Sequence, residues 1–181
     1  MRDDIDNTYK WLNTILEDHD YDPSWDYEVD GNPNKEYIEY CNNIMQEINT
    51  LIPTLKLGMG KASVHYIKNE SDTVAVYAHG TGSNPVFMIN LEEIDSVRDQ
   101  LRQDDIQPVN IITDIKMTLF HEFAHAIQDL LELEYDEDEA EDFAISYVDH
   151  NSVTPFWEVV HDNDGEYRWN TDTLRYDIQT Q

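Results

Sequence analysis

The chain of 181 residues has few basic side chains, one cysteine and no long apolar run. Its 11 Lys and Arg stand against 39 Asp and Glu, which gives a formal net charge of −28 at pH 7. A surface this negative repels nucleic-acid phosphates and anionic membranes, so direct nucleic-acid binding is not expected. Attraction of basic proteins, mimicry of DNA and a merely solvated acidic surface all remain compatible with this charge.

The single cysteine, Cys41, excludes an internal disulfide and is typical of a buried, inert thiol. The first residues, MRDDIDNTYKW, are not a basic-plus-apolar signal, and no apolar run approaches the roughly 18 residues of a membrane span. We therefore expect a cytoplasmic protein without a membrane partner. An apolar content of 40% and an aromatic content of 11% are enough for a folded core. The length suits one compact domain, with or without an appended subdomain.

Two helical patterns precede a glycine-broken connection, LKLGMGK. Apolar residues at helical spacing predict an amphipathic helix over 5–20 and a second helix over 35–52, which Pro53 is expected to end. The segment 20–34 between them is rich in Asp, Pro, Gly and Asn and predicts turns. We assign residues 1–58 to an N-terminal helical segment.

Three short strand patterns follow this connection. Residues 62–68, 73–80 and 84–94 have β-type patterns and are separated by turn signals, which predicts a small sheet arranged as a meander. A further helix is expected from about 92 to 103.

Two more helices are expected after Pro108. The segment 113–133 has the strongest helical pattern in the chain, with Thr113 or Asp114 as its N-cap, and 136–150 has an apolar stripe of its own. On the first of these helices, a face separate from the apolar one should line a cleft. Its residues are Thr118, His121, His125, Gln128 and Glu132.

The stretch HEFAHAIQ, residues 121–128, contains the pattern HExxH on this helix. Histidines four residues apart lie one turn apart on one helix face, so the imidazoles of His121 and His125 can reach one zinc ion. Glu122 is turned about 100° around the helix axis, which suits contact with a zinc-activated water better than ligation. HExxH also arises by chance, so the remainder of a metal site has to be found before it predicts a hydrolase.

A catalytic zinc site keeps three protein ligands and one open position, so a third ligand must come from another segment. The acidic block EDEAEDFA, residues 137–144, is the obvious source. Glu137 and Glu141 are four apart, so one carboxylate can bind the ion while the other orients a ligand histidine. The block also contains Glu139, and spacing leaves the choice of the third ligand open.

HEFAHAIQ followed by EDEAEDFA resembles the compact gluzincin zinc metallopeptidases, or minigluzincins, including the ImmA/IrrE-type and related small phage and bacterial enzymes. Those families show HExxH on one helix and Glu-x-x-Ala-(Asp/Asn)-x-Phe-Ala on the next. The resemblance covers about 60–150 and implies a catalytic Glu122 and a zinc ion bound by His121, His125 and Glu137.

Two positions around these motifs stay open. Glu141 stands where the family usually has Asp or Asn, so Glu141 and Glu139 remain alternative ligands or partners of a ligand histidine. The resemblance also implies an edge strand that pairs with an extended substrate, here NPVFMIN with Val86, Phe87 and Met88. A peptidase of this kind benefits from a donor to the oxyanion, and the chain offers several candidates. They are His150, Tyr147, His161, Tyr167 and Tyr176.

The sequence therefore predicts an α+β fold, in which a small, mostly antiparallel sheet packs on the HExxH helix and on a following Glu-bearing helix, with an N-terminal helical layer. Residues 59–150 are the expected gluzincin-like core, and the aromatic-rich tail 151–181 is expected to pack on it. The predicted function is zinc-dependent hydrolysis of a protein or peptide substrate, and the acidity favours basic substrates. The alternative is an acidic protein-interaction module, such as a DNA mimic or an inhibitor, on a catalytically silent gluzincin scaffold.

Overall fold

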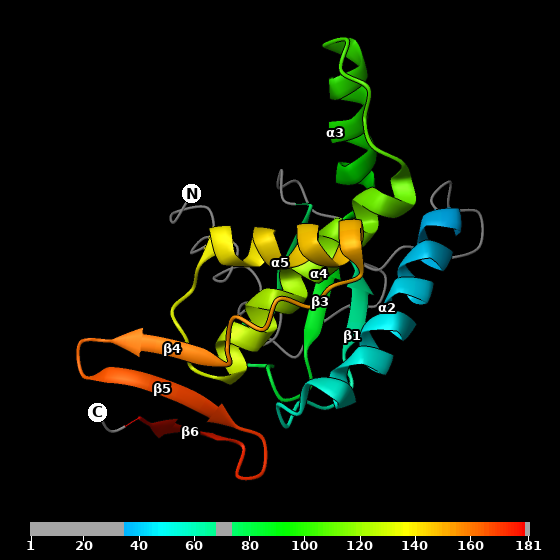
Figure 1. Ribbon diagram of the computed structural model, residues 1–181. Helices are drawn as coiled ribbons and strands as arrows, with labels where there is room; N and C mark the ends of the chain where they lie inside the picture. The colour runs from blue at the N-terminus through cyan, green and yellow to red at the C-terminus, as the bar shows by residue number, and fades with distance from the viewer. Residues whose placement is uncertain (1–34, 68–73, 180–181) are drawn as a thin grey trace.

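The structure is a computed structural model that describes residues 35–67 and 74–179. Within these ranges the chain forms four helices and two three-stranded sheets, which confirms the predicted α+β class (Figure 1). The helix predicted over 5–20 and the turns predicted over 20–34 lie outside the described residues.

The first sheet contains β1 (Ser63–Tyr66), β2 (Ala75–Tyr77) and β3 (Val86–Ile89). β3 pairs with β1 in parallel and with β2 in antiparallel fashion, so the order is β1-β3-β2. The predicted meander is therefore wrong. The short turn before β3 allows hairpin pairing with β2, whereas β1 joins the sheet on the other side of β3.

The central place of β3 also overturns the predicted substrate strand. Val86, Phe87 and Met88 were expected at a sheet edge, but the backbone of β3 bonds to a neighbour on each side. Phe87 and Met88 are buried as well. A substrate strand cannot be added to β3, whereas β2 pairs with β3 alone among the described residues and so is an edge strand of this sheet as described.

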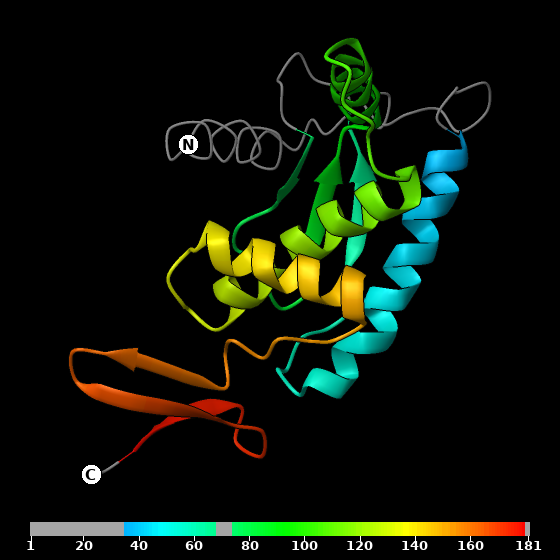
Figure 2. The ribbon, with the colours of Figure 1, turned by 45° about the horizontal axis from the view of Figure 1, so that its top comes forward.

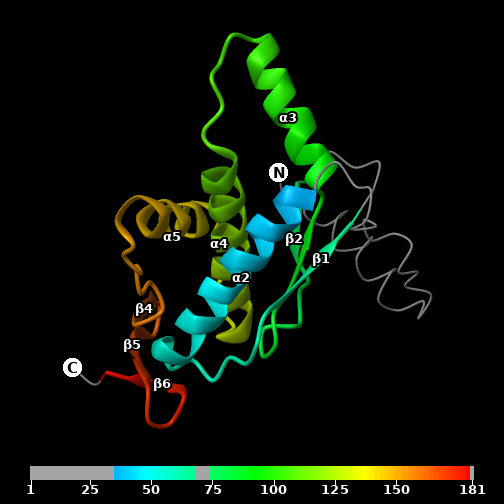
Figure 3. The ribbon, with the colours of Figure 1, turned by 90° about the vertical axis from the view of Figure 1, so that its right-hand side faces the viewer.

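The sheet is covered on one side by two helices, with a third helix outside them (Figure 3). α2 (Lys35–Leu55) turns Ile38, Cys41 and Ile48 inward. Pro53 lies within its last turn, and the helix ends two residues beyond it, where Lys56 takes a left-handed φ of 54°. Proline removes one backbone donor but does not unwind the residues that follow it at once.

α4 (Ile111–Leu130) is the helix that contains HExxH, and it packs between the sheet and α5 (Glu137–His150) (Figures 1 and 2). It begins earlier than predicted, because Asn110 is the N-cap and its side chain accepts a hydrogen bond of 2.9 Å from the Ile112 N–H. It ends at Leu130, earlier than the predicted 133, and Glu132 then takes a left-handed φ of 57° that reverses the chain.

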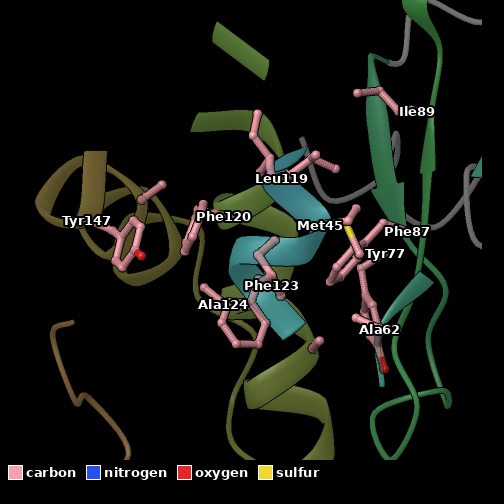
Figure 4. Packing of buried hydrophobic residues seen from close by; sticks show 14 of the residues in the cluster. Met45, Ala62, Tyr77, Phe87, Ile89, Leu119, Phe120, Phe123, Ala124 and Tyr147 are labelled. Atoms are coloured by element: carbon pink, nitrogen blue, oxygen red, sulfur yellow. The ribbon is translucent and has the colours of Figure 1, made fainter. Parts of the chain in front are cut away.

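The core lies around the aromatic face of α4. Figure 4 shows Phe120 beside Tyr147 of α5, while Phe123 and Leu119 lie on the side of Phe87 and Tyr77 of the sheet. The Phe120 and Tyr147 rings stack with their centroids 4.0 Å apart. α2 contributes Met45 and its neighbours to this same cluster, so the N-terminal helix and the strands share one core.

α3 (Leu91–Gln103) stands out from the body of the fold (Figures 1 and 3). Its buried Arg98 holds the returning segment in place. The Arg98 Nη1 atom donates to the Val109 carbonyl at 2.7 Å and to Asp114 Oδ2 at 3.0 Å. This bond connects α3 to the first turn of α4, upstream of the histidines.

The tail forms a second sheet of β4 (Val159–Asp162), β5 (Gly165–Asn170) and β6 (Arg175–Ile178), paired antiparallel in that order. Its packing on the core depends on aromatic side chains. Trp157 is buried in the main cluster, and the Trp169 Nε1–H donates to the Lys56 carbonyl at 3.0 Å. Beyond these contacts the sheet extends away from the helices (Figures 1 and 2).

Across residues 35–67 and 74–179, no helix combines the length and apolarity needed to cross a membrane.

Candidate metal centre

Two imidazoles on α4 meet at the middle of the helix. His121 and His125 are one turn apart, and their Nε2 atoms are 3.1 Å from each other. His125 is buried, whereas His121 is partly exposed. This placement follows from local helix geometry, because residues i and i+4 share a face.

A carboxylate from α5 completes this pair. Glu137 Oε1 lies 2.9 Å from His125 Nε2, and Glu137 Oε2 lies 3.1 Å from His121 Nε2. In a tetrahedral zinc site with metal–ligand distances of about 2.0–2.1 Å, two ligand atoms are about 3.3 Å apart. The three side chains therefore have the chemistry and nearly the spacing of a zinc-binding triad, and together they form a group among the described residues that could hold a metal ion.

Glu137 reaches the histidines because the turn 131–136 reverses the chain between the two helices. Asp136 caps α5 by accepting a hydrogen bond of 3.0 Å from the Glu139 N–H, so Glu137 is the first helical residue. The residue expected as the third ligand is thus placed at the end of α5 that lies beside the middle of α4.

Hydrogen bonds at the Nδ1 atoms of His121 and His125 orient the two rings so that their Nε2 atoms point toward Glu137. His125 Nδ1 lies 2.8 Å from Gln128 Oε1, and the Gln128 amide nitrogen donates to the Asp136 carbonyl and to Glu139 Oε1, each at 3.0 Å. The amide oxygen is only an acceptor, so His125 Nδ1 carries the proton and Nε2 keeps its lone pair. His121 Nδ1 lies 3.0 Å from Glu141 Oε2 and is oriented in the same way. Glu141 and Glu139 therefore lie outside the triad as hydrogen-bond partners.

The protonation states also suit a cation. Burial lowers the pKa of His125, which favours the neutral imidazole. Burial by itself would raise the pKa of Glu137, but the hydrogen bond from Tyr135 and the charges of His125 and His121 outweigh it and hold that pKa below its usual value. A metal requires neutral imidazoles and an ionised carboxylate, and the lowered pKa of His125 together with the hydrogen bond from Tyr135 to Glu137 favours that form.

Glu122 lies next to this triad without belonging to it. Burial, followed by the nearby charge of Glu137, raises the pKa of Glu122 to about 8, and a hydrogen bond from the backbone of Tyr77 partly opposes the shift. In the metal-free protein Glu122 is therefore largely protonated at neutral pH, and a cation bound nearby would lower its pKa and favour the ionised carboxylate. Because Tyr77 belongs to β2, this hydrogen bond makes the position of the Glu122 carboxylate depend on that strand.

Strand β2 is held against α4 by Asp129. The Tyr77 hydroxyl donates to Asp129 Oδ2 at 2.5 Å, and the Gly80 N–H donates to the same oxygen at 2.8 Å. The following turn packs so closely that a Cβ at Gly82 would lie 2.9 Å from backbone atoms of Leu130. This contact fixes the free edge of the sheet beside the histidines.

A groove of about 500 Å³ opens beside the triad, between β2, α4 and α5, and both His121 and Glu122 line it. Its apolar lining consists of Val74, Ala75, Val109, Met117 and Val148. Its acidic lining consists of Asp114, Glu122, Glu141 and Asp149. Among the described residues that line it, none is Lys or Arg, so the groove is apolar along its walls and negative in charge.

The proposed oxyanion donors do not gather at this groove. Tyr147 and His150 lie on α5 ten and thirteen residues after Glu137, which is about 15 and 20 Å along a helix. The Tyr147 hydroxyl instead donates to Glu47 Oε1 at 2.8 Å. Neither residue lines the groove, although their neighbours Val148 and Asp149 do, so their role as oxyanion donors stays a prediction. His161 is exposed on β4, and no hydrogen bond between described residues joins it to the triad.

Tyr135 is a site residue that the sequence did not indicate. Its ring stacks on the His125 imidazole with centroids 4.1 Å apart and an angle of 9° between the planes, and its hydroxyl donates to Glu137 Oε1. The chain contains 11 tyrosines, and nothing in the spacing of Tyr135 distinguishes it from the others.

Comparison of the chain with protein families, with curated proteins and with solved structures finds no match. The function is therefore inferred from the residues of this centre and from the motifs that supply them.

Proposed function

We propose that this protein is a zinc-dependent peptidase of the gluzincin type. The observation that supports it most directly is the convergence of His121 Nε2, His125 Nε2 and the Glu137 carboxylate at mutual distances of 2.9–3.1 Å. Two imidazoles and one carboxylate are a donor set that catalytic zinc sites use, with one coordination position left for water or substrate. A zinc ion bound there would act as a Lewis acid and would lower the pKa of a water molecule that it binds.

Glu122 is the general base of this proposal. Its position beside the triad suits a carboxylate that takes a proton from the attacking water and passes it to the leaving amine, and a bound cation would lower its pKa so that it is ionised for this role. The hydrogen bond from the Tyr77 backbone limits the directions in which the carboxylate can turn. In the reaction, the Nδ1–H groups of His121 and His125 stay hydrogen-bonded, so their Nε2 atoms remain oriented toward the metal position.

The free edge of β2 is the proposed docking strand for an extended substrate, in place of β3. The backbone groups of Val74 and Ala78 bond toward β3. In an antiparallel strand the polar groups alternate, so Ala75 directs its N–H and C=O, and Tyr77 its C=O, to the opposite edge, whereas the Tyr77 N–H already bonds to Glu122. Ala75 lines the groove together with Glu122 and His121. A peptide added to this edge would lie across the centre and gain main-chain hydrogen bonds.

The substrate is proposed to be a protein or peptide with basic side chains near the cleaved bond. Apolar walls suit the methylene stem of Lys or Arg, and Glu141, Asp149 and Asp114 supply negative charge. Asp114 is already paired with Arg98 and Glu141 with His121 Nδ1, so Asp149 should contribute most of the preference. The net charge of −28 would also steer basic substrates toward the protein at low salt.

The decisive experiment combines metal analysis with peptide cleavage. Wild-type protein purified without chelator should contain about one zinc per chain and cleave a mixed peptide library, and His125→Ala should lose both properties. Glu122→Gln should keep zinc and cleave nothing. Asp177→Asn, on β6, is the control for a change of charge far from the centre and should behave like wild type in both assays. Absence of zinc and other transition metals from the wild type would refute the proposal.

The alternative function, an acidic interaction module, gives a different result in the same experiment. A protein that binds zinc, cleaves no library peptide and captures a basic partner equally well with Glu122→Gln and without metal would favour it. The cytoplasmic location remains an expectation from the sequence.

A further inference from the structure

One aromatic side chain contacts two members of the triad that come from different helices. Tyr135 lies in the turn between α4 and α5, one residue before the N-cap of α5. Its ring is nearly parallel to that of His125, with centroids 4.1 Å apart. Its hydroxyl donates to Glu137 Oε1, the same oxygen that lies 2.9 Å from His125 Nε2.

These contacts restrict different degrees of freedom. The phenol has one O–H donor and the ionised carboxylate has only acceptors, so the bond sets the rotation of the Glu137 carboxylate. Each carboxylate oxygen has two acceptor positions, which leaves a lone pair on Oε1 for a metal while Tyr135 stays bonded. The stacked ring restricts the plane of the His125 imidazole on the side that Gln128 does not reach by hydrogen bonding.

Burial does not account for this hydrogen bond. The Tyr135 side chain is 40% exposed, so its hydroxyl is not a group that folding has removed from water and left in need of a protein partner. An exposed hydrogen bond contributes little to folding. The contact gains its importance from what it orients, which is a carboxylate at the end of a helix with several other rotamers available to it.

We propose that Tyr135 is a positioning residue of the metal centre, which holds Glu137 through its hydroxyl and His125 through its ring in the geometry that binds zinc. The inference rests on the zinc site of the proposed function and is independent of peptide hydrolysis. Partners that orient metal ligands typically change metal affinity by 10- to 100-fold when they are removed.

The test measures zinc affinity of the full chain by competition with a chromophoric chelator, together with the melting temperature of the metal-free protein. Tyr135→Phe keeps the ring and removes the hydroxyl, so zinc should bind about tenfold more weakly. Tyr135→Ala removes both contacts, and the loss should be larger, toward 100-fold. Neither substitution should change the melting temperature of the metal-free protein by much, because the side chain is exposed.

Tyr37→Phe is the matched control. The Tyr37 hydroxyl also donates to a carboxylate, Asp95 Oδ1, at 2.8 Å, but it lies on α2, away from the triad. This variant should bind zinc as tightly as wild type. A drop in zinc affinity for Tyr135→Phe, with none for Tyr37→Phe, supports the inference.

Other results would overturn it. Wild-type zinc affinity in both Tyr135 variants would show that Tyr135 does not position the ligands, as would an equal loss in Tyr37→Phe. A wild-type protein that binds no zinc would remove both the inference and the proposed function. Normal zinc binding without cleavage of any peptide would remove the peptidase proposal alone and leave the role of Tyr135 intact.

Discussion

The amide of Gln128 offers the sharpest test of how the histidines are oriented. Gln128 is 1% exposed, accepts from His125 Nδ1 at 2.8 Å and donates to the Asp136 carbonyl at 3.0 Å. Gln128→Leu has a similar volume and removes all of these bonds. The imidazole N–H of His125, a residue that is 2% exposed, would then be buried without an acceptor.

The structure sets two magnitudes for this substitution. Leaving one buried donor unsatisfied costs about 1–3 kcal/mol of unfolding free energy. For a chain of this size that corresponds to a melting temperature lower by roughly 2–4 °C for each kcal/mol. Zinc affinity should fall by about 10- to 100-fold, because without an acceptor at Nδ1 the His125 proton can move to Nε2 and occupy the lone pair that the metal needs.

Both quantities are measurable on the same preparations. Urea denaturation of the chelator-treated protein gives the change in unfolding free energy, and chelator competition gives the zinc affinity. Gln100→Leu is the control, because Gln100 donates at 3.3 Å to an exposed carboxylate on α3 and has no contact with the centre. Its zinc affinity should equal that of wild type.

The reasoning would be refuted by a Gln128→Leu protein that binds zinc like wild type. Lower stability with unchanged zinc affinity would mean that the amide supports packing alone and that the tautomer of His125 is set by another group.

Three further predictions concern single residues of the metal-free protein. The pKa of Glu122 is raised to about 8, so the folded protein keeps a proton that the unfolded chain releases near pH 4.5. This difference favours the folded state at low pH, and the contribution to the unfolding free energy is lost as pH rises toward 8. Glu122→Gln should therefore become more stable relative to wild type between pH 5 and 8 in urea titrations, and parallel pH profiles would contradict this. Burial raises the pKa of the Cys41 thiol to about 12, so this thiol should not react with a thiol reagent at pH 8 until the protein is denatured. Rapid labelling of Cys41 in the native protein would show that α2 does not pack as described. Phe120→Ala should lower the unfolding free energy by about 3–5 kcal/mol, because it empties the centre of the core, and a loss below about 1 kcal/mol would mean that this core is not formed.

The local features of this protein were predictable because they depend on nearby residues. Helical periodicity predicted α3 over 92–103 and the described structure has it at Leu91–Gln103. The i, i+4 spacing of His121 and His125 requires only one helix turn, so their shared face followed at once. Helix ends were less accurate, as Asn110 shows, because a cap three or four residues upstream competes equally well for the start of a helix.

Sheet order could not be predicted in the same way. The patterns of β1, β2 and β3 indicate strands but contain no information on which strand pairs with which, and β3 was placed at the edge although it is central. The same limit applies to the oxyanion candidates: Tyr147 has a suitable side chain, but its place relative to the centre follows from the direction of α5.

The sequence by itself determined the chemistry available to this protein: two histidines on one helix face, a block of glutamates on the next helix and an excess of negative charge. Helix geometry is local, so these groups are arranged by residues within one or two turns of them. Tertiary structure alone decided that Glu137 meets the two imidazoles and that Glu141 and Gln128 orient them. It also decided that Tyr135 stacks on His125 and that β2 lies beside the centre. These contacts depend on the path of the turn 131–136 and on the packing of α4 between the sheet and α5, and such long-range packing has no signature in the spacing of residues.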